Sequence, residues 1–337
     1  MARRLFDSII IVDWSAASVP SRGKDSIWMA EASVSGPQAQ HQPPVNIATR
    51  DEAATRLNAR ITNAATQGER LLIGFDFPLG YPAGSARAMG GEGSGAPWQS
   101  IWAMLSAMLQ EGPKNRNNRF EVAATLNRRI AAATGASPGP FWGRPASREL
   151  ADLPLRKPGA YGTAWPAEFR HVEHVMRSET RRRPSSCWQL FYNPTVGGQA
   201  LTGIAMLERL RQAPHLASAL RIWPFETGLA APAMSAGMTV LAEVYPSLIR
   251  DAIIAAEMPG ETRDAAQVRV LAGALAKLDG NAALAPLFEG TSALSPQQRI
   301  MVQDEEAWVL GAGHGRALAE AARQCSEDQL PDKGHGP

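Results

Sequence analysis

The 337-residue sequence predicts an α/β protein in which helices flank a mixed sheet and a long irregular insertion interrupts the fold. Short apolar runs with strand composition alternate with segments whose apolar residues recur every three to four positions, which predicts the class. This regularity falls away between residues 78 and 194 and returns from residue 197, which predicts the insertion. The core is therefore expected in two halves, residues 1–77 and 195–325, around an insertion or lid at 78–194.

The first half reads as a hairpin followed by a crossover. Residues 8–13 and 26–33 are predicted strands, because the segment VPSRGKD between them supplies the Pro, Gly and Asp of a turn. Residues 50–66 are a predicted helix, with apolar positions three and four apart. The strand 71–76 follows this helix and is expected to lie parallel to the first strand.

The remaining elements follow the same rules. Within the insertion, helical spacing is confined to 98–110, 119–133 and 166–179. The second half is expected to contain two strands and four helices, namely strands at 220–226 and 239–246 and helices at 199–213, 246–257, 262–278 and 296–323. Residues 326–337 are expected to be a disordered tail.

Composition limits the class of protein. With 45% hydrophobic and 20% charged residues the chain can bury a core. No membrane span and no secretory signal is recognisable, and the two cysteines, Cys187 and Cys325, form no CxxC motif, so a reducing cytoplasm is the expected compartment.

The charge is weakly positive but unevenly spread. A net charge of +2 does not by itself predict nucleic-acid binding, yet basic clusters stand at 114–119, 127–129 and 181–183. Each is either a solvated surface or part of a groove that binds phosphates, and both interpretations stay open.

Two predicted strands end on an aspartate, Asp13 in IIIVDWSAAS and Asp76 in LLIGFDFPLG. Ligands bind beyond the carboxyl ends of parallel strands, and two carboxylates side by side there suit a divalent ion such as Mg²⁺ or Mn²⁺. The alternative is that each aspartate only caps a turn.

Further carboxylates come late in the chain. Glu243 lies in LAEVYP, as a further ligand or a structural acid, and Asp304, Glu305 and Glu306 open the last predicted helix in QDEEAW. This acidic run is either part of the metal site or a favourable first turn at the positive end of a helix dipole.

Several residues are candidates for binding a phosphate or substrate. Backbone N–H groups before the helix at 199–213 would be free to hold an anion, although an ordinary glycine turn explains the same pattern. The candidates are Ser15, Lys24, Arg119, Arg128, Thr195, Gly197, Gly198 and Gln199.

The blocks DWSAAS, GFDFPLGYP, AEVYPS and DEEA, in this order, resemble those of the domain of unknown function family 429, over nearly the whole chain. The resemblance implies a ribonuclease H-like fold with metal-binding acids on the first strand, near the fourth strand and on the last helix. These would be Asp13, Asp76 and Glu306 or Asp304. Family members tend to carry an Asp-Ala pair in that helix, where this chain has Glu306 and Ala307.

Three functions follow from these observations. The first is a Mg²⁺- or Mn²⁺-dependent nuclease or phosphodiesterase acting on nucleic acid or a nucleotide. The second is a phosphotransferase or cofactor-biosynthesis enzyme for a nucleotide-containing small molecule, of the molybdopterin guanine dinucleotide type. The third is a nucleic-acid or nucleotide binding protein without catalysis.

Overall fold

The structure of the chain is a computed structural model that describes residues 3–35, 38–91 and 95–327. Most of the predicted tail, from residue 328 on, lies outside the described residues. None of the described helices is both long and apolar enough to cross a membrane.

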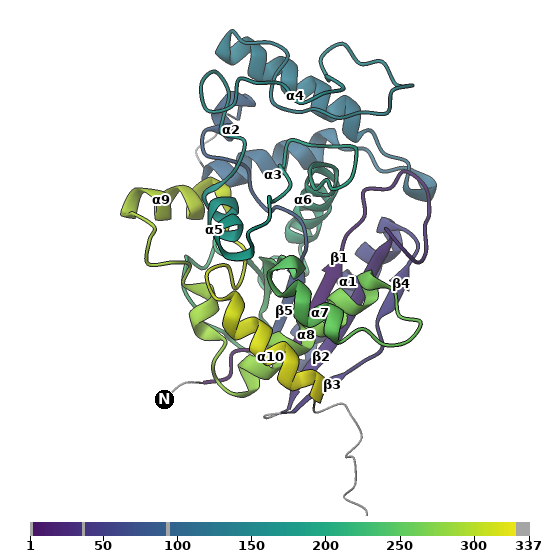
Figure 1. Cartoon of the computed structure of the whole chain (residues 1–337), viewed down its shortest axis with the longest axis vertical. Helices are drawn as coiled ribbons and strands as arrows, with labels where there is room; N and C mark the ends of the chain where they lie inside the picture. Colours follow the sequence, from purple (N-terminus) through teal and green to yellow (C-terminus); the bar gives the residue numbers. More distant parts are fainter. Residues whose placement is uncertain (1–2, 36–37, 92–94, 328–337) are drawn as a thin grey trace, which may run out of the picture.

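One mixed sheet of seven strands organises the described chain, which confirms the predicted α/β class (Figure 1). Its order is β3-β2-β1-β5-β7-β6, with β4 also paired to β2. β2 is antiparallel to β1, β3 and β4, whereas β1, β5, β7 and β6 run parallel to one another. The strands are β1 (Ser8–Asp13), β2 (Ile27–Ser35), β3 (Gln38–His41), β4 (Val45–Ile47), β5 (Leu71–Phe75), β6 (Leu220–Ile222) and β7 (Thr239–Glu243).

Helices cover both faces of this sheet. The α-helices are α1 (Arg50–Gln67), α2 (Ser85–Ala88), α3 (Pro97–Met108), α4 (Arg119–Thr134), α5 (His171–Thr180), α6 (Gly197–Gln212), α7 (Arg250–Ala255), α8 (Arg263–Gly280), α9 (Pro296–Met301) and α10 (Gly315–Glu327). Short 3₁₀ turns are η1 (Pro113–Asn115), η2 (Pro246–Ile249) and η3 (Ala285–Phe288), and η4 (Val302–Glu306) is one π-helical turn.

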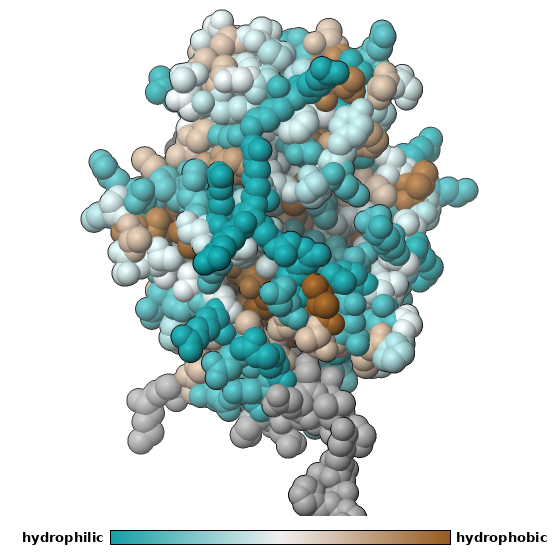
Figure 2. Space-filling model, in the orientation of Figure 1, coloured by the Kyte–Doolittle hydropathy of each residue, from teal (hydrophilic) through white to brown (hydrophobic). Residues whose placement is uncertain are grey.

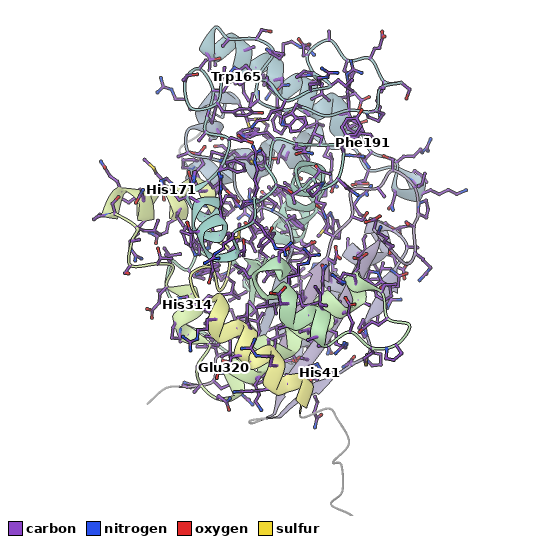
Figure 3. The ribbon with its side chains drawn as sticks, in the orientation of Figure 1. His41, Trp165, His171, Phe191, His314 and Glu320 are labelled. Atoms are coloured by element: carbon purple, nitrogen blue, oxygen red, sulfur yellow. The ribbon has the colours of Figure 1, made fainter. Side chains whose placement is uncertain are left out.

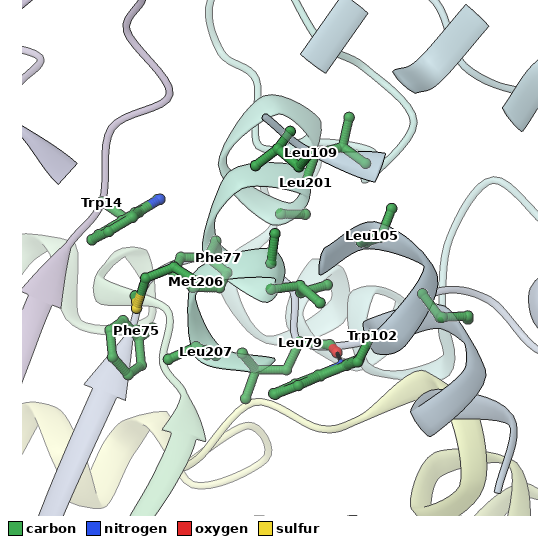
Figure 4. Packing of buried hydrophobic residues seen from close by; sticks show 14 of the residues in the cluster. Trp14, Phe75, Phe77, Leu79, Trp102, Leu105, Leu109, Leu201, Met206 and Leu207 are labelled. Atoms are coloured by element: carbon green, nitrogen blue, oxygen red, sulfur yellow. Dashed lines mark hydrogen bonds between the residues drawn. The ribbon is translucent and has the colours of Figure 1, made fainter. Parts of the chain in front are cut away.

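Side chains alternate between the two faces of each strand and so build two separate cores. On β1, Ile9 and Ile11 belong to the core under α8 and α10, whereas Ile10 and Val12 belong to the core under α1, α3 and α6. Figure 4 shows the second core, where Trp14 and the aromatic side chains after β5 pack against α6. This alternation also decides on which face an acid at a strand end lies.

The insertion contributes its aromatic residues to the same core as the sheet. Tyr81, Phe141 and Trp188 pack together with ring centroids 4.8–6.0 Å apart. Trp98, Trp102 and Trp165 are also buried, so these indoles are packed inside the protein rather than displayed for stacking on bases (Figure 3 labels Trp165). Apolar side chains on the face seen in Figure 2 are confined to small separate patches.

The prediction of one helix over 296–323 is wrong. Helical structure ends at Glu306, because Ala307 has φ +62° and Gly311 and Gly313 also adopt positive φ. Glycine favours this left-handed region, and a helix cannot continue through it. The run Asp304–Glu306 therefore lies at the end of a short helical segment, not in the first turn of a long one.

Other predicted elements are also shorter than expected, among them the strand at 239–246, which ends at Glu243. The strand at 220–226 stops at Ile222, since Trp223 is followed by Pro224, which lacks the N–H that a ladder needs. The helix at 166–179 begins only at His171, after Pro166.

We predict that Gly203→Ala destabilises the fold. Gly203 lies on α6 against the ring of Phe77, and a methyl group there would overlap that ring. Overpacking of this kind costs about 1–3 kcal/mol. Urea unfolding should show this loss, whereas Gly159→Ala, which points into open space, should change the free energy of unfolding by less than about 0.5 kcal/mol. Equal stability of the two variants would contradict the close approach of α6 to Phe77.

Candidate functional site

The structure brings Asp13 and Asp76 together at the carboxyl edge of the sheet. β1 and β5 are parallel neighbours, and the Asp76 N–H donates to the carbonyl of Val12 at 3.3 Å. Asp76 Oδ1 in turn accepts from the N–H of Trp14 at 2.8 Å. Each carboxyl group shifts the pKa of the other, so the two side chains lie close together. Two neighbouring carboxyl groups resist ionising at the same time, because each negative charge disfavours the other.

Burial and mutual repulsion make this pair hard to ionise fully. Burial, followed by the charge of Asp76, raises the pKa of Asp13 well above its usual range. Burial raises the pKa of Asp76 to about 6, against the hydrogen bond from the Trp14 N–H, which lowers it. The repulsion between the two carboxylates can be relieved by a proton or by a bound cation.

A third acid, Asp264, lies near the pair, and sequence reasoning missed it. Its charge raises the pKa of both Asp13 and Asp76, and its own pKa is raised by burial. Asp264 stands in the first turn of α8, which packs on β1 and β2, and its carboxylate accepts from the N–H of Asp25 at 2.8 Å. The available signal was the pair Asp264–Ala265, an Asp-Ala pair inside a predicted helix.

Glu243 lies on the other face of the sheet and has a structural role. On β7 its neighbours in sequence, Ala242 and Val244, belong to the core under α8, so the Glu243 side chain points to the opposite side. There it forms a buried ion pair with Arg170 at 2.6 Å and accepts from the N–H of Leu79 at 3.0 Å. Of the two interpretations of Glu243, the structure favours the structural acid.

Two acids of η4, Glu305 and Glu306, hold the loop after β5 through its backbone N–H groups. Glu306 accepts from the N–H of Ala83 at 3.0 Å, from the N–H of His171 at 2.8 Å and contacts its Nδ1 at 2.7 Å (Figure 3 shows His171 at the start of α5). Glu305 accepts from the N–H groups of Gly84 and Ala86 at 2.7 and 2.5 Å, and burial raises its pKa. Asp304 is half-buried. The carboxylates of Glu305 and Glu306 are therefore committed to backbone donors.

The carboxylate chemistry of Asp13 and Asp76 fits a divalent ion, and Asp264 lies near enough for its charge to raise the pKa of both. Hard cations take carboxylate oxygens, and a bound ion would balance the negative charge of the pair. In the part of the chain that the structure describes, no group of three or more His, Cys, Asp or Glu side chains stands close enough to enclose an ion. The predicted set of Asp13, Asp76 and Glu306 is not assembled.

Two predicted substrate-binding residues lie at the rim of this site. Ser15 Oγ donates to the carbonyl of Asp25 at 3.2 Å and accepts from the N–H of Ala17. Lys24 is exposed, and its charge lowers the pKa of Asp264. The segment after β1 and the turn before β2 therefore meet beside the first turn of α8.

A second group of predicted residues meets on the other side of the segment after β1. The Arg119 guanidinium donates to Ser18 Oγ at 2.8 Å, and Gly198 lies against both Ala16 and Arg119. Gln199 Nε2 donates to the carbonyl of Trp14.

The other three predicted phosphate binders have local partners. Thr195 Oγ1 and the Gly197 N–H both donate to the carbonyl of Gln189. Arg128 is exposed and pairs with Asp152 at 3.0 Å. These contacts account for Thr195, Gly197 and Arg128 without a ligand.

A cleft of about 1050 Å³ opens beside Trp14, between α1, η1 and α6. Its polar lining includes Arg50, Asn58, Glu111 and Lys114. Small-molecule sites typically span about 300–1,000 Å³, so the cleft is large enough for a nucleotide.

We predict that the Asp13–Asp76 pair makes stability fall as pH rises when divalent ions are chelated. The unfolded chain releases the Asp76 proton near pH 3.8 and the folded protein near pH 6, so the folded state binds more protons between these values. Stability should therefore fall by about 1–3 kcal/mol from pH 4 to pH 7 relative to Asp76→Asn. Urea unfolding across this range measures the difference, and parallel curves for the two proteins would contradict it.

We predict that Arg170→Met is strongly destabilising, because it leaves Glu173 and Glu243 buried without a cation. Breaking a buried pair in this way costs about 3–5 kcal/mol. The matched control is Arg183→Met, whose ion pair with Glu168 at 3.1 Å is exposed and worth about 0–1 kcal/mol. Thermal or urea unfolding distinguishes the two, and equal losses would contradict the structural role.

No family model matches this chain, and neither a curated protein nor a solved structure is significantly similar to it. Function is therefore inferred from the site residues themselves.

Proposed function

We propose that the protein is a divalent-metal-dependent phosphodiester hydrolase, a nuclease or phosphodiesterase that acts on nucleic acid or a nucleotide. The observation that carries the proposal is the juxtaposition of two buried carboxyl groups, Asp13 and Asp76, at the ends of two parallel strands. Asp264 adds a third acidic charge beside them. Buried carboxylates that repel one another are costly unless a proton or an ion balances their charge.

Asp13 and Asp76 would hold Mg²⁺ or Mn²⁺, with Asp264 as the third carboxylate in place of Glu306. Such an ion, when bound, activates water and neutralises the charge that develops on a phosphoryl group. The Trp14 N–H fixes one Asp76 oxygen, which orients the carboxylate before any ion arrives. Lys24, at the rim, would attract the phosphate of the substrate.

The topology supports a ribonuclease H-like fold. β1 stands between the antiparallel strand β2 and the parallel strand β5, and α8 packs across β1 and β2. The acids then occupy the first strand, the end of the next parallel strand and the helix α8. The resemblance to the domain of unknown function family 429 implies the first two positions, but it implies the last helix for the third, and α8 is not the last helix. The Asp264–Ala265 pair matches that family's Asp-Ala pair better than Glu306–Ala307 does.

A small nucleotide-containing substrate is the second candidate, and the cleft beside Trp14 favours it. Its volume of about 1050 Å³ suits a nucleotide, and its lining mixes apolar α6 residues with Arg50 and Lys114. Hydrolysis of mononucleotides or dinucleotides, but not of oligonucleotides, would favour this candidate.

The decisive experiment compares Asp13→Asn, Asp264→Asn and Asp304→Asn with the wild-type protein. With Mn²⁺ and a panel of oligonucleotides and nucleotides, the first two variants should lose at least about 100-fold in kcat/KM, because each removes a charge that holds the ion. Asp304→Asn should retain wild-type activity. Calorimetric titration with Mn²⁺ should show weaker binding for the first two variants only.

Three results would each contradict a different part of the proposal. Wild-type protein that binds no Mn²⁺ and cleaves no phosphodiester would exclude a metal-dependent hydrolase. Binding of nucleotide without turnover would indicate a non-catalytic binding protein. Loss of activity in Asp304→Asn with full activity in Asp264→Asn would return the third acid to η4.

A further inference from the structure

Arg119 differs from the other buried arginines of the protein. Arg50, Arg170 and Arg269 each form an ion pair with a glutamate. Arg119 is only 7% exposed, yet in the described parts of the chain no carboxylate lies within ion-pair distance of it. A buried charge without a counter-ion is costly. An unpaired buried arginine therefore points to an anionic ligand that would balance its charge.

The Arg119 side chain is held in place by neutral groups. Its Nη1 donates to Ser18 Oγ at 2.8 Å and to Asn117 Oδ1 at 2.9 Å, and its guanidinium lies 4.3 Å from the centroid of the Phe120 ring. Its Nε is buried without a hydrogen-bond partner. These contacts orient the guanidinium and leave part of its donor capacity unused. Burial, followed by the charges of Arg50 and Arg148, lowers the pKa of Arg119 to about 10, which still leaves it charged at neutral pH.

The unused side of Arg119 faces the start of α6. A Cβ atom on Gly198 would lie 3.3 Å from Arg119 Nε, so the guanidinium stands directly against the first turn of this 16-residue helix. The N-cap residue Val196 provides no side-chain cap. Gly198 and Gln199 occupy positions in the first turn, where N–H groups have no acceptor within the helix. Their dipoles add positive potential beside the guanidinium.

We propose that Arg119 and the first turn of α6 bind one phosphate group of the substrate. The guanidinium would donate from the fork that neutral partners leave free, and the N–H groups of Gly198 and Gln199 would complete the contacts. This site deepens the proposed function, because it names the chemical group that the protein grips apart from the Asp13–Asp76 pair. The two lie on either side of the segment Trp14–Ser18, which Gln199 and Arg119 both contact.

The test measures phosphate binding without a divalent ion, so that its outcome does not depend on hydrolysis. Inorganic phosphate and AMP are titrated calorimetrically into wild-type protein and Arg119→Met in the presence of EDTA, with adenosine as the ligand that lacks a phosphate. We expect Arg119→Met to weaken phosphate and AMP binding on the order of 10- to 100-fold, the effect of losing charged hydrogen bonds.

Arg128→Met is the matched control. Arg128 lies on the same helix α4, but it is exposed and pairs with Asp152, so its replacement should leave both affinities unchanged. The melting temperature separates binding from folding, because Arg119→Met removes an uncompensated buried charge and should be as stable as wild type or more so. Gly198→Ala approaches the site from the other side and should also weaken phosphate binding, since its methyl group would crowd Arg119 Nε.

Titrations with AMP and with a short oligothymidine distinguish the two possible sources of the phosphate group. Binding of AMP and a short oligothymidine with similar dependence on Arg119 assigns the site to nucleic-acid backbone as well as mononucleotides, and dependence for AMP alone assigns it to small molecules. Equal phosphate affinity in wild type and Arg119→Met, or a lower melting temperature without a change in affinity, would overturn the site. Intact phosphate binding by an Asp13→Asn protein that has lost hydrolysis supports both proposals, whereas absent hydrolysis in wild type with intact phosphate binding would remove only the proposed function.

Discussion

The ion pairs of the buried Arg170 guanidinium determine how the insertion is attached to the carboxyl edge of the sheet. It joins Glu173 of α5 to Glu243 at the end of β7, and its Nη1 also donates to the carbonyl of Glu306 at 2.8 Å. Three segments far apart in sequence are thereby fixed at one point. Glu243 accepts from the N–H of Leu79 as well, so the network also fixes the chain three residues beyond Asp76. The insertion is thus tied to the same sheet edge that carries the candidate site.

Strand alternation separates structural acids from the candidate site at that edge. Phe75 and Glu243 are partners in the β5–β7 register, and both point toward the core under α6. Asp76 is one position further along and points to the opposite face, where Asp13 and the first turn of α8 lie. Acids that are neighbours along the sheet edge therefore have different roles, because Glu243 meets a cation whereas Asp76 meets another acid. A shift of one residue in either strand would exchange these environments.

The sequence alone predicted those elements of the fold that a local residue pattern determines. The strand β1, the helix α1 and the aspartates at two strand ends follow from alternation, helical spacing and turn residues, and the structure has each of these elements. The short strands β3 and β4 were not assigned to residues, because segments of three or four residues are too short to show a periodic pattern. Asp264 was missed for a different reason. Its proximity to Asp13 arises from how α8 packs on β1, a contact across about 250 residues that no local pattern encodes. The end of helix at Ala307 was hidden because that residue has high helix propensity, and only its tertiary setting imposes a positive φ.

The segment Trp14–Ser18 separates a group of acids from a buried arginine, and within the described chain neither group has a counter-ion. These unpaired charges are the main physical indication of a ligand site in this protein. Asp13, Asp76 and Asp264 crowd negative charge on one side of Trp14–Ser18, and Arg119 with the first turn of α6 places positive charge on the other. By contrast, the buried arginines Arg50 and Arg269 each form an ion pair with a glutamate. A cation bound on the acidic side and an anion on the basic side would satisfy both groups at once. A metal ion together with a phosphate-containing substrate has this pair of charges, which is why the two separate anomalies support one chemical interpretation.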